Sequence, residues 1–204
     1  MARLSNAVRE EVLNNTRQQL LAAAAAEFTQ EGYAGANINR ISLAAGFAKG
    51  TIYNYFSSKW ELMLALIDDI AARHVAFILQ QAEPETDPGQ CLLRFFSAGF
   101  AFVEQHPTLA PVVINAVYGP NKEFKERVYQ AYAPLFSLLI EGIIGAGVAQ
   151  GHFRSVDPNI TAALVMTIYL GGSSLFKPDG TVFLDPEQVV SFILNGIRQQ
   201  NANP

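Results

Sequence analysis

Apolar residues recur at the spacing of one helix face along most of this chain, and no convincing stretch alternates as a β-strand does. The first such stretch contains Leu13, Leu20, Leu21, Ala24 and Phe28. Breaks with glycine or proline separate segments of about 10 to 30 residues, the length range of helices. Half of the 204 residues are hydrophobic, which is enough to enclose a core. We therefore expect an all-α fold, with residues 181–184 as a candidate for a short extended piece.

Cys91 is the single cysteine, which excludes an intramolecular disulfide or a cysteine-based zinc site and favours a reducing compartment. It precedes Leu92 and Leu93, so we expect it to be packed in the core, with redox sensing as the open alternative. The uncharged stretch 158–176 is as long as a membrane span, but its polar residues and glycines favour a buried helix. With no secretory signal apparent, we expect a cytoplasmic protein without a membrane partner, metal or cofactor.

Charge is distributed unevenly along the chain. Residues 1–60 contain six basic and four acidic side chains, whereas residues 61–204 contain eight basic and fourteen acidic ones. A basic N-terminal part on an acidic remainder is consistent with local contact to nucleic acid. The difference is small, so it gains weight only together with a motif.

Residues 37–56 have the pattern of a helix-turn-helix. Asn37 is a suitable N-cap for a short first helix, and Gly46 suits a turn that requires a positive φ. The second short segment, residues 49–55, would enter the major groove of DNA, whose width suits one helix.

The groove-facing side of that segment carries small and polar residues. We expect Lys49 and Thr51 to hydrogen-bond base edges or phosphates, and Gly50 to let the backbone approach the DNA closely. The residues suited to phosphate contact are Tyr53, Asn54 and Lys59. Arg40 has two interpretations of equal weight, a phosphate ligand or a solvated helix charge.

This motif resembles the DNA-binding domain of the TetR family of transcriptional regulators. The similarity covers about residues 12–65 and is carried by EGY at 31–33 and AAGFAKGTIYNYFSSKWEL at 44–62. It implies an all-α homodimer whose N-terminal heads read DNA and whose C-terminal domains dimerise and bind a small ligand that releases the DNA. It also implies that Lys49, Gly50 and Thr51 lie nearest the bases, and that Asn37 touches a phosphate.

Three positions depart from the family pattern. Ala48 stands where serine or threonine is usual, so the recognition helix lacks a side-chain cap, a loss of about 1 kcal/mol. Ser42 replaces a common alanine, and Asn54 replaces a frequent histidine. The DNA-binding interpretation stands, and the operator sequence stays open.

Aromatic residues crowd the chain after residue 87, and most of them should belong to the core. The resemblance implies that some of them line an apolar ligand cavity. The candidates for this lining are Phe96, Phe100, Tyr132, Phe136 and Tyr169, with Glu104, His106 or Asn115 as polar anchors. Pro134 should bend the helix predicted over 121–150 and open space for a small apolar or aromatic effector.

The stretch 158–176 and the predicted last helix, 186–199, have apolar faces that a monomer would leave partly exposed. We assign nine residues to a dimer interface of two helices per subunit: Leu164, Ile168, Gly171, Leu175, Val189, Phe192, Ile193, Gly196 and Ile197. A two-fold dimer would present two recognition helices to a palindromic DNA site.

These interpretations divide the chain into a DNA-binding domain at 1–60, whose fourth helix continues as a connector, and a ligand-binding and dimerisation domain at 61–204. They predict a repressor that its ligand releases from a palindromic operator, with an activator of the same fold as the alternative. An all-α enzyme is the other class considered. It is disfavoured because His74, His106 and His152 lie far apart and no nucleophile, metal-ligand or phosphate-loop motif is present.

Overall fold

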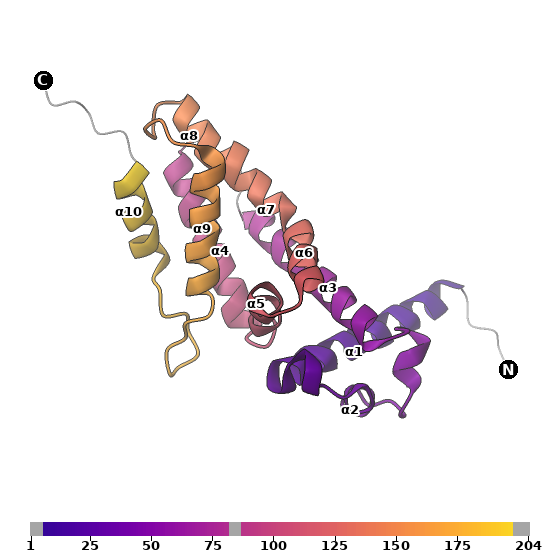
Figure 1. The fold of residues 1–204 in the computed structure, drawn as a ribbon. Helices are drawn as coiled ribbons and strands as arrows, with labels where there is room; N and C mark the ends of the chain where they lie inside the picture. Colours follow the sequence, from indigo (N-terminus) through magenta and orange to yellow (C-terminus); the bar gives the residue numbers. More distant parts are fainter. Residues whose placement is uncertain (1–5, 82–86, 198–204) are drawn as a thin grey trace, which may run out of the picture.

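This computed structural model describes residues 6–81 and 87–197, and helices make up its regular structure (Figure 1). An N-terminal head contains α1 (Asn6–Gly35), α2 (Ile38–Ala44) and the short 3-10 helix η1 (Thr51–Asn54). The long helix α3 (Lys59–Gln81) connects the head to the body. The body contains the remaining helices: α4 (Pro88–Gln105), α5 (Ala110–Tyr118), α6 (Lys122–Ala131), α7 (Ala133–Ser137), η2 (Leu138–Gly145), α8 (Ala146–Ala149), α9 (Pro158–Gly172) and α10 (Pro186–Ile197). The prediction of an all-α fold is confirmed.

β pairing within the described ranges is limited to one antiparallel bridge between Phe176 and Val182. The extended piece predicted at 181–184 therefore contributes one paired residue. The last two residues of the helix predicted over 186–199 lie outside the described part of the chain.

Local signals close the head where the sequence predicts them. Gly32 has φ 66° and interrupts α1 before its last turn. Asn37 caps α2, its Oδ1 accepting from the backbone N–H of Asn39 at 2.9 Å. Gly46 forms the turn with φ 84°. The segment predicted over 49–55 is shorter and tighter than expected: only η1 is helical, and it is a 3-10 helix.

The helix α3 runs from the head into the body (Figure 1). Ser58 Oγ accepts from the N–H of Glu61 at 3.1 Å, as in a capping box. The Glu61 carboxylate reaches back to the N–H of Ser57 at 2.7 Å, one residue earlier than in that motif. The long buried face of α3 then packs against α4 and α6.

The bend predicted at Pro134 is present. Helix α6 ends at Ala131, and the continuous helix formed by α7, η2 and α8 leaves it at an angle of 56°. Pro134 lies in the first turn of α7, where its missing N–H costs no helical hydrogen bond. Helix α9 packs on η2, and α10 packs on α4.

No single helix of residues 6–81 and 87–197 has both the length and the apolar composition of a membrane span. The bent pair formed by α6 and residues 133–149 passes that test only when its two parts are joined. The uncharged stretch 158–176 forms α9, which has 15 residues and buries one side in the core, as predicted.

Candidate functional site

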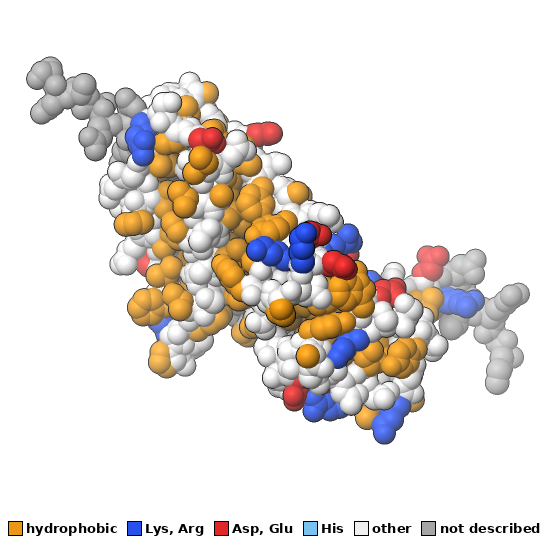
Figure 2. All heavy atoms as spheres, viewed as in Figure 1, with side chains coloured by type: hydrophobic (Ala, Val, Ile, Leu, Met, Phe, Trp, Pro, Cys, Tyr) orange, Lys and Arg blue, Asp and Glu red, His pale blue; other side chains and the backbone are white. Residues whose placement is uncertain are grey.

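The tip of the head presents a small, partly basic surface. Lys49, Tyr53 and Asn54 are exposed, the Tyr53 side chain by 52%. Gly50 and Thr51 are half-buried between them. Figure 2 shows Lys and Arg side chains at the end of the head that lies away from the body. The structure thus brings together the residues predicted to face the DNA groove, which we call the tip surface (residues 48–54).

Backbone geometry at the tip surface depends on one buried hydroxyl that sequence reasoning undervalued. Ser42 is fully buried on α2, and its Oγ donates to the carbonyl oxygen of Ala48 at 2.7 Å. Ile52 is buried beneath η1, and Gly50 precedes η1 with φ 86°. η1 has no side-chain cap; the sequence placed the missing cap at Ala48, whereas the N-cap residue of η1 is Gly50. Ser42 therefore fixes the turn from the opposite side.

Of its two predicted roles, Arg40 fits the solvated helix charge, since its side chain is 51% exposed on α2. Its guanidinium pairs with Glu27 at 2.6 Å and with Glu31 at 3.0 Å, so it joins α2 to α1. Burial alone would raise the pKa of Glu27, but the Asn37 N–H and Arg40 offset it, and the net pKa is lowered. The guanidinium is thus engaged within the head rather than directed at a phosphate.

Lys59 also differs from its predicted phosphate contact. Its Nζ donates to the carbonyl oxygens of Ala34 at 3.0 Å and Ala36 at 3.1 Å. The same ammonium lies 5.0 Å from the centre of the Tyr33 ring, a cation–π distance. Lys59 therefore caps the end of α1. The sequence contains no signal for this contact, because 25 residues separate Lys59 from Ala34.

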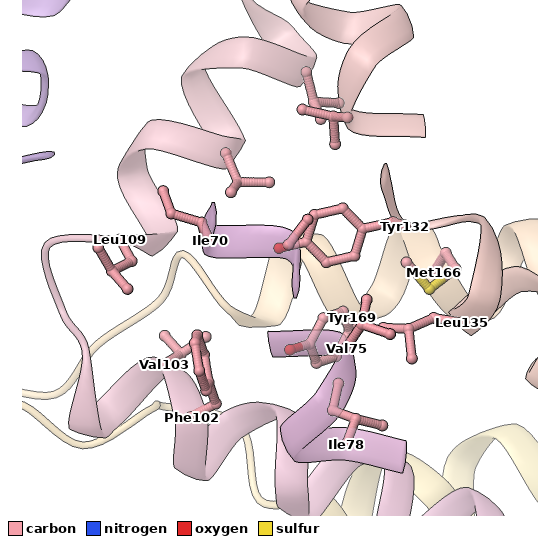
Figure 3. Close-up of a cluster of buried hydrophobic side chains, with 14 of the residues drawn as sticks. Ile70, Val75, Ile78, Phe102, Val103, Leu109, Tyr132, Leu135, Met166 and Tyr169 are labelled. Carbon is pink, nitrogen blue, oxygen red and sulfur yellow. The ribbon is translucent and has the colours of Figure 1, made fainter. Parts of the chain in front are cut away.

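A partly open cavity of about 40 Å³ lies in the body between α3, α4, α5, α6, α7 and α9. Its wall is mostly apolar, and Figure 3 shows part of it, with Phe102, Tyr132, Met166 and Tyr169 converging from three segments of the chain. Of the predicted aromatic lining, Tyr132, Phe136 and Tyr169 line the cavity.

Phe96 and Phe100 do not line the cavity. Both are buried behind Tyr169, with ring centroids 5.9 Å and 5.7 Å from its ring. Gly99 on the same helix leaves room for this ring, since a Cβ at that position would overlap it. The two phenylalanines therefore position Tyr169 instead of contacting a ligand.

The three predicted polar anchors lie elsewhere. Glu104 accepts from the N–H of Val182 at 2.8 Å and holds the loop before α10. His106 packs on Phe102, with ring centroids 4.7 Å apart. Asn115 is exposed on α5. None of the three belongs to the cavity wall.

His74 is the polar residue that sequence reasoning missed. Its Nδ1 lies 3.1 Å from the Tyr132 hydroxyl and its Nε2 lies 2.7 Å from the Tyr169 hydroxyl. Burial, with a smaller contribution from His106, lowers the pKa of His74 to about 4. Burial also raises the pKa of both tyrosines, so all three groups are uncharged at neutral pH. The available signal was its place on the apolar face of α3, between Ile70 and Ile78.

The predicted dimer residues divide into two groups. Leu164, Gly171, Leu175, Phe192 and Gly196 are exposed, and Ile168 is half-buried. The other three are wrongly assigned, because Val189, Ile193 and Ile197 are each only 8% exposed and form the inward side of α10. Apolar residues occupy both the buried and the exposed side of α10. The sequence pattern does not distinguish the two sides, and only packing against the body decides which residues are buried.

No group of three or more His, Cys, Asp or Glu side chains in the described part of the chain could hold a metal ion. Cys91 is buried on α4, as predicted.

Comparison with known proteins agrees with this arrangement. Residues 20–66 match the family described as "Bacterial regulatory proteins, tetR family". The chain is 30% identical over 167 residues to the HTH-type transcriptional repressor NicS of Pseudomonas putida, covering 78% of this chain and 75% of NicS.

Two solved structures are similar in fold. The fatty acid degradation regulator FadR from Bacillus halodurans has a TM-score of 0.79 and 24% identity, covering 91% of this chain and 97% of that one. FadR from Bacillus subtilis in complex with stearoyl-CoA has a TM-score of 0.74 and 19% identity, covering 87% and 95%. With a DNA-binding head and a relative of this identity and coverage, the chain belongs to the TetR family of bacterial regulatory proteins and is a transcriptional regulator, not an enzyme.

Proposed function

We propose that this protein is a homodimeric repressor that binds a palindromic operator through its tip surface and leaves it when a small apolar molecule enters the body. Residues 1–60 then form the DNA-binding domain and residues 61–204 the ligand-binding and dimerisation domain, acting in the cytoplasm. The observation that carries this proposal is helix α6, which contacts the head at one end and the cavity at the other.

Two aromatic contacts join α6 to α1 of the head and to the start of α3 beside it. Phe124 on α6 stacks on Trp60 with ring centroids 4.5 Å apart, and its ring lies 4.8 Å from that of Tyr33. Tyr132 follows the last residue of α6 and lines the cavity. A displacement of α6 at the cavity would therefore also move the aromatic residues that it contacts at the base of the head.

The size of the cavity makes such a displacement necessary. A cavity that holds benzene has a volume of about 150 Å³, whereas this one has about 40 Å³. An effector with even one aromatic ring must move the surrounding helices apart. Ligand entry would then shift the population toward a form whose heads no longer fit the operator.

The effector is expected to be apolar in the part that enters the cavity. The Bacillus subtilis FadR structure contains stearoyl-CoA. In the present chain the apolar wall suits an acyl chain or an aromatic skeleton, and any large charged group would have to remain outside.

The dimer would form through the exposed faces of α9 and α10. Leu164 is 60% exposed and Phe192 is 75% exposed, and Ile160 on α9 is 62% exposed. Figure 2 shows hydrophobic side chains spread over this side of the body. Large apolar side chains at this exposure are typical of an uncovered interface. Sedimentation equilibrium should find a dimer, and Leu164→Glu or Phe192→Glu should shift it toward monomer.

DNA binding can be tested by fluorescence anisotropy with the DNA upstream of the chain's own gene. Lys49→Ala and Tyr53→Ala should weaken binding, and Lys49→Ala should reduce the slope of log affinity against log salt by about 1. Lys177→Ala and Tyr118→Phe are matched controls at exposed positions of the body and should bind as the wild type does. Unchanged affinity for both tip variants would refute the proposal.

Repression and its direction need a separate measurement. A promoter fusion compared with and without the gene should show higher expression when the gene is absent. Lower expression in its absence would identify the activator alternative.

A further inference from the structure

Four residues of the cavity wall bring polar groups together in an otherwise apolar space. We call this cluster the polar pole; it consists of His74, Tyr132, Tyr169 and Ser173. Ser173 follows the last residue of α9, and its N–H donates to the carbonyl oxygen of Tyr169 at 2.9 Å. The two hydroxyls of Tyr132 and Tyr169 lie on opposite nitrogens of the His74 ring.

One of the two tyrosine hydroxyls in the polar pole always keeps a proton that is not donated to His74. Neutral His74 carries one N–H and one bare nitrogen. One tyrosine hydroxyl therefore donates to the bare nitrogen, while the other accepts from the N–H and keeps its own proton. Exchanging the tautomer exchanges the two tyrosines, but one phenolic O–H remains to donate in either case.

Ser173 adds a second unused group. The residue is buried, with only 4% of its surface exposed. Its Oγ has no partner at hydrogen-bond distance among the described residues, although it lies near enough to the Tyr169 hydroxyl to lower the pKa of that group slightly against the effect of burial. A buried hydroxyl without a partner destabilises the empty protein, and a ligand atom that supplies the partner recovers that free energy.

The pole carries no charge and has no cation beside it. His74 is neutral, and none of the residues lining the cavity is Lys or Arg. A carboxylate placed here would lose its hydration without gaining a counter-ion.

We propose that the polar pole binds an uncharged oxygen acceptor of the effector, such as the carbonyl oxygen of a ketone, ester or thioester. This inference rests on the proposed function and refines it: the effector is an apolar skeleton with a neutral oxygen acceptor, which receives hydrogen bonds from a tyrosine hydroxyl and from Ser173. Pure hydrocarbons and free carboxylates of equal length are poor ligands.

The test compares head groups on matched skeletons. The probes are the methyl ketones from hexan-2-one to dodecan-2-one and 4-phenylbutan-2-one, each beside the hydrocarbon and the carboxylate of the same skeleton. Binding to the full-length protein is followed by the melting temperature and by the emission of Trp60, the single tryptophan, which contacts α6 through Phe124. At least one ketone should bind about tenfold more tightly than its hydrocarbon, which corresponds to one good hydrogen bond, and its carboxylate should bind more weakly still.

The key variant is Ser173→Ala, which removes a hydroxyl that contributes no hydrogen bond to the empty protein. It should fold with an unchanged or higher melting temperature and lose about two- to tenfold of the ketone-over-hydrocarbon preference. Tyr132→Phe should also reduce this preference, whereas Tyr118→Phe, at an exposed position outside the cavity, should keep it.

The outcomes separate this inference from the proposed function. Equal binding of ketone, hydrocarbon and carboxylate would overturn the polar pole and leave an effector cavity in place. A ketone-over-hydrocarbon preference that Ser173→Ala leaves undiminished would overturn it too. Ketones that bind selectively without releasing DNA would support the pole and contradict the repressor mechanism. If no probe binds, both proposals fail.

Discussion

Titration of the buried histidine offers a quantitative test of the cavity's electrostatics. The pKa of His74 is lowered from 6.5 to about 4, chiefly by burial. A histidine with a depressed folded pKa binds more protons in the unfolded state, so acid favours unfolding. Its effect begins as the pH falls below the unfolded value of 6.5 and is complete below about pH 4.

The shift sets the size of the effect. A difference of roughly 2.5 pKa units corresponds to about 3 kcal/mol at its limit. Between about pH 7 and pH 5 the same two pKa values predict a loss of about 2 kcal/mol in the free energy of unfolding.

Urea denaturation followed by far-UV circular dichroism, at fixed protein concentration, measures this loss. The comparison is with His74→Gln, whose amide can still hydrogen-bond to the two tyrosines but does not titrate. Groups that do not interact with His74 cancel in the difference, whereas His106, whose pKa is lowered by burial and by Arg73, contributes to the His74 shift and cancels only in part. Glu27 and Glu61, with lowered pKa values, lose their contribution only at more acidic pH.

The wild-type curve should fall more steeply than the variant curve by about 2 kcal/mol over this window. Parallel curves would show that His74 is not buried as a neutral group. A wild type that gains stability relative to the variant on acidification would reverse the sign and refute the reasoning.

Three further substitutions test the geometry of the head and the body. Ser42→Ala should lower the free energy of unfolding by about 1 kcal/mol and weaken DNA binding, because the Ala48 carbonyl loses its buried donor; unchanged operator affinity in anisotropy would contradict this. Gly50→Ala should cost about 1 kcal/mol or slightly more in thermal melts, because a Cβ disfavours φ 86°. Gly99→Ala should cost about 1 to 3 kcal/mol and abolish ketone selectivity by displacing Tyr169, and a variant that keeps both stability and selectivity would count against this packing.

Structural features that depend on only a few neighbouring residues were predicted correctly from the sequence. Asn37 caps α2, Gly46 makes the turn and Pro134 follows the bend, because each effect depends on a residue's own φ preference or on an N–H two residues away. The exposed residues of the tip surface could likewise be predicted from the sequence, since they lie within one short motif.

Partners distant in sequence were decided by the tertiary structure alone. Lys59 was predicted to hold a phosphate, and Arg40 either to hold one or to be a solvated charge. Folding places the carbonyl of Ala34 within reach of Lys59 and Glu27 within reach of Arg40. A long charged side chain binds whichever partner packing brings near, and sequence pattern does not encode that choice.

The cavity and the two sides of α10 show the same division. Helical periodicity predicts that α10 is apolar, but packing on α4 decides that Val189 faces inward and Phe192 outward. His74, Tyr132 and Tyr169 come from three helical regions separated by 58 and 95 residues from His74. The sequence by itself therefore determined the helices and the DNA-reading motif, because these follow from short-range stereochemistry. Only the tertiary structure decided which polar groups meet in the body, because burial and hydrogen-bond partners arise when the helices pack.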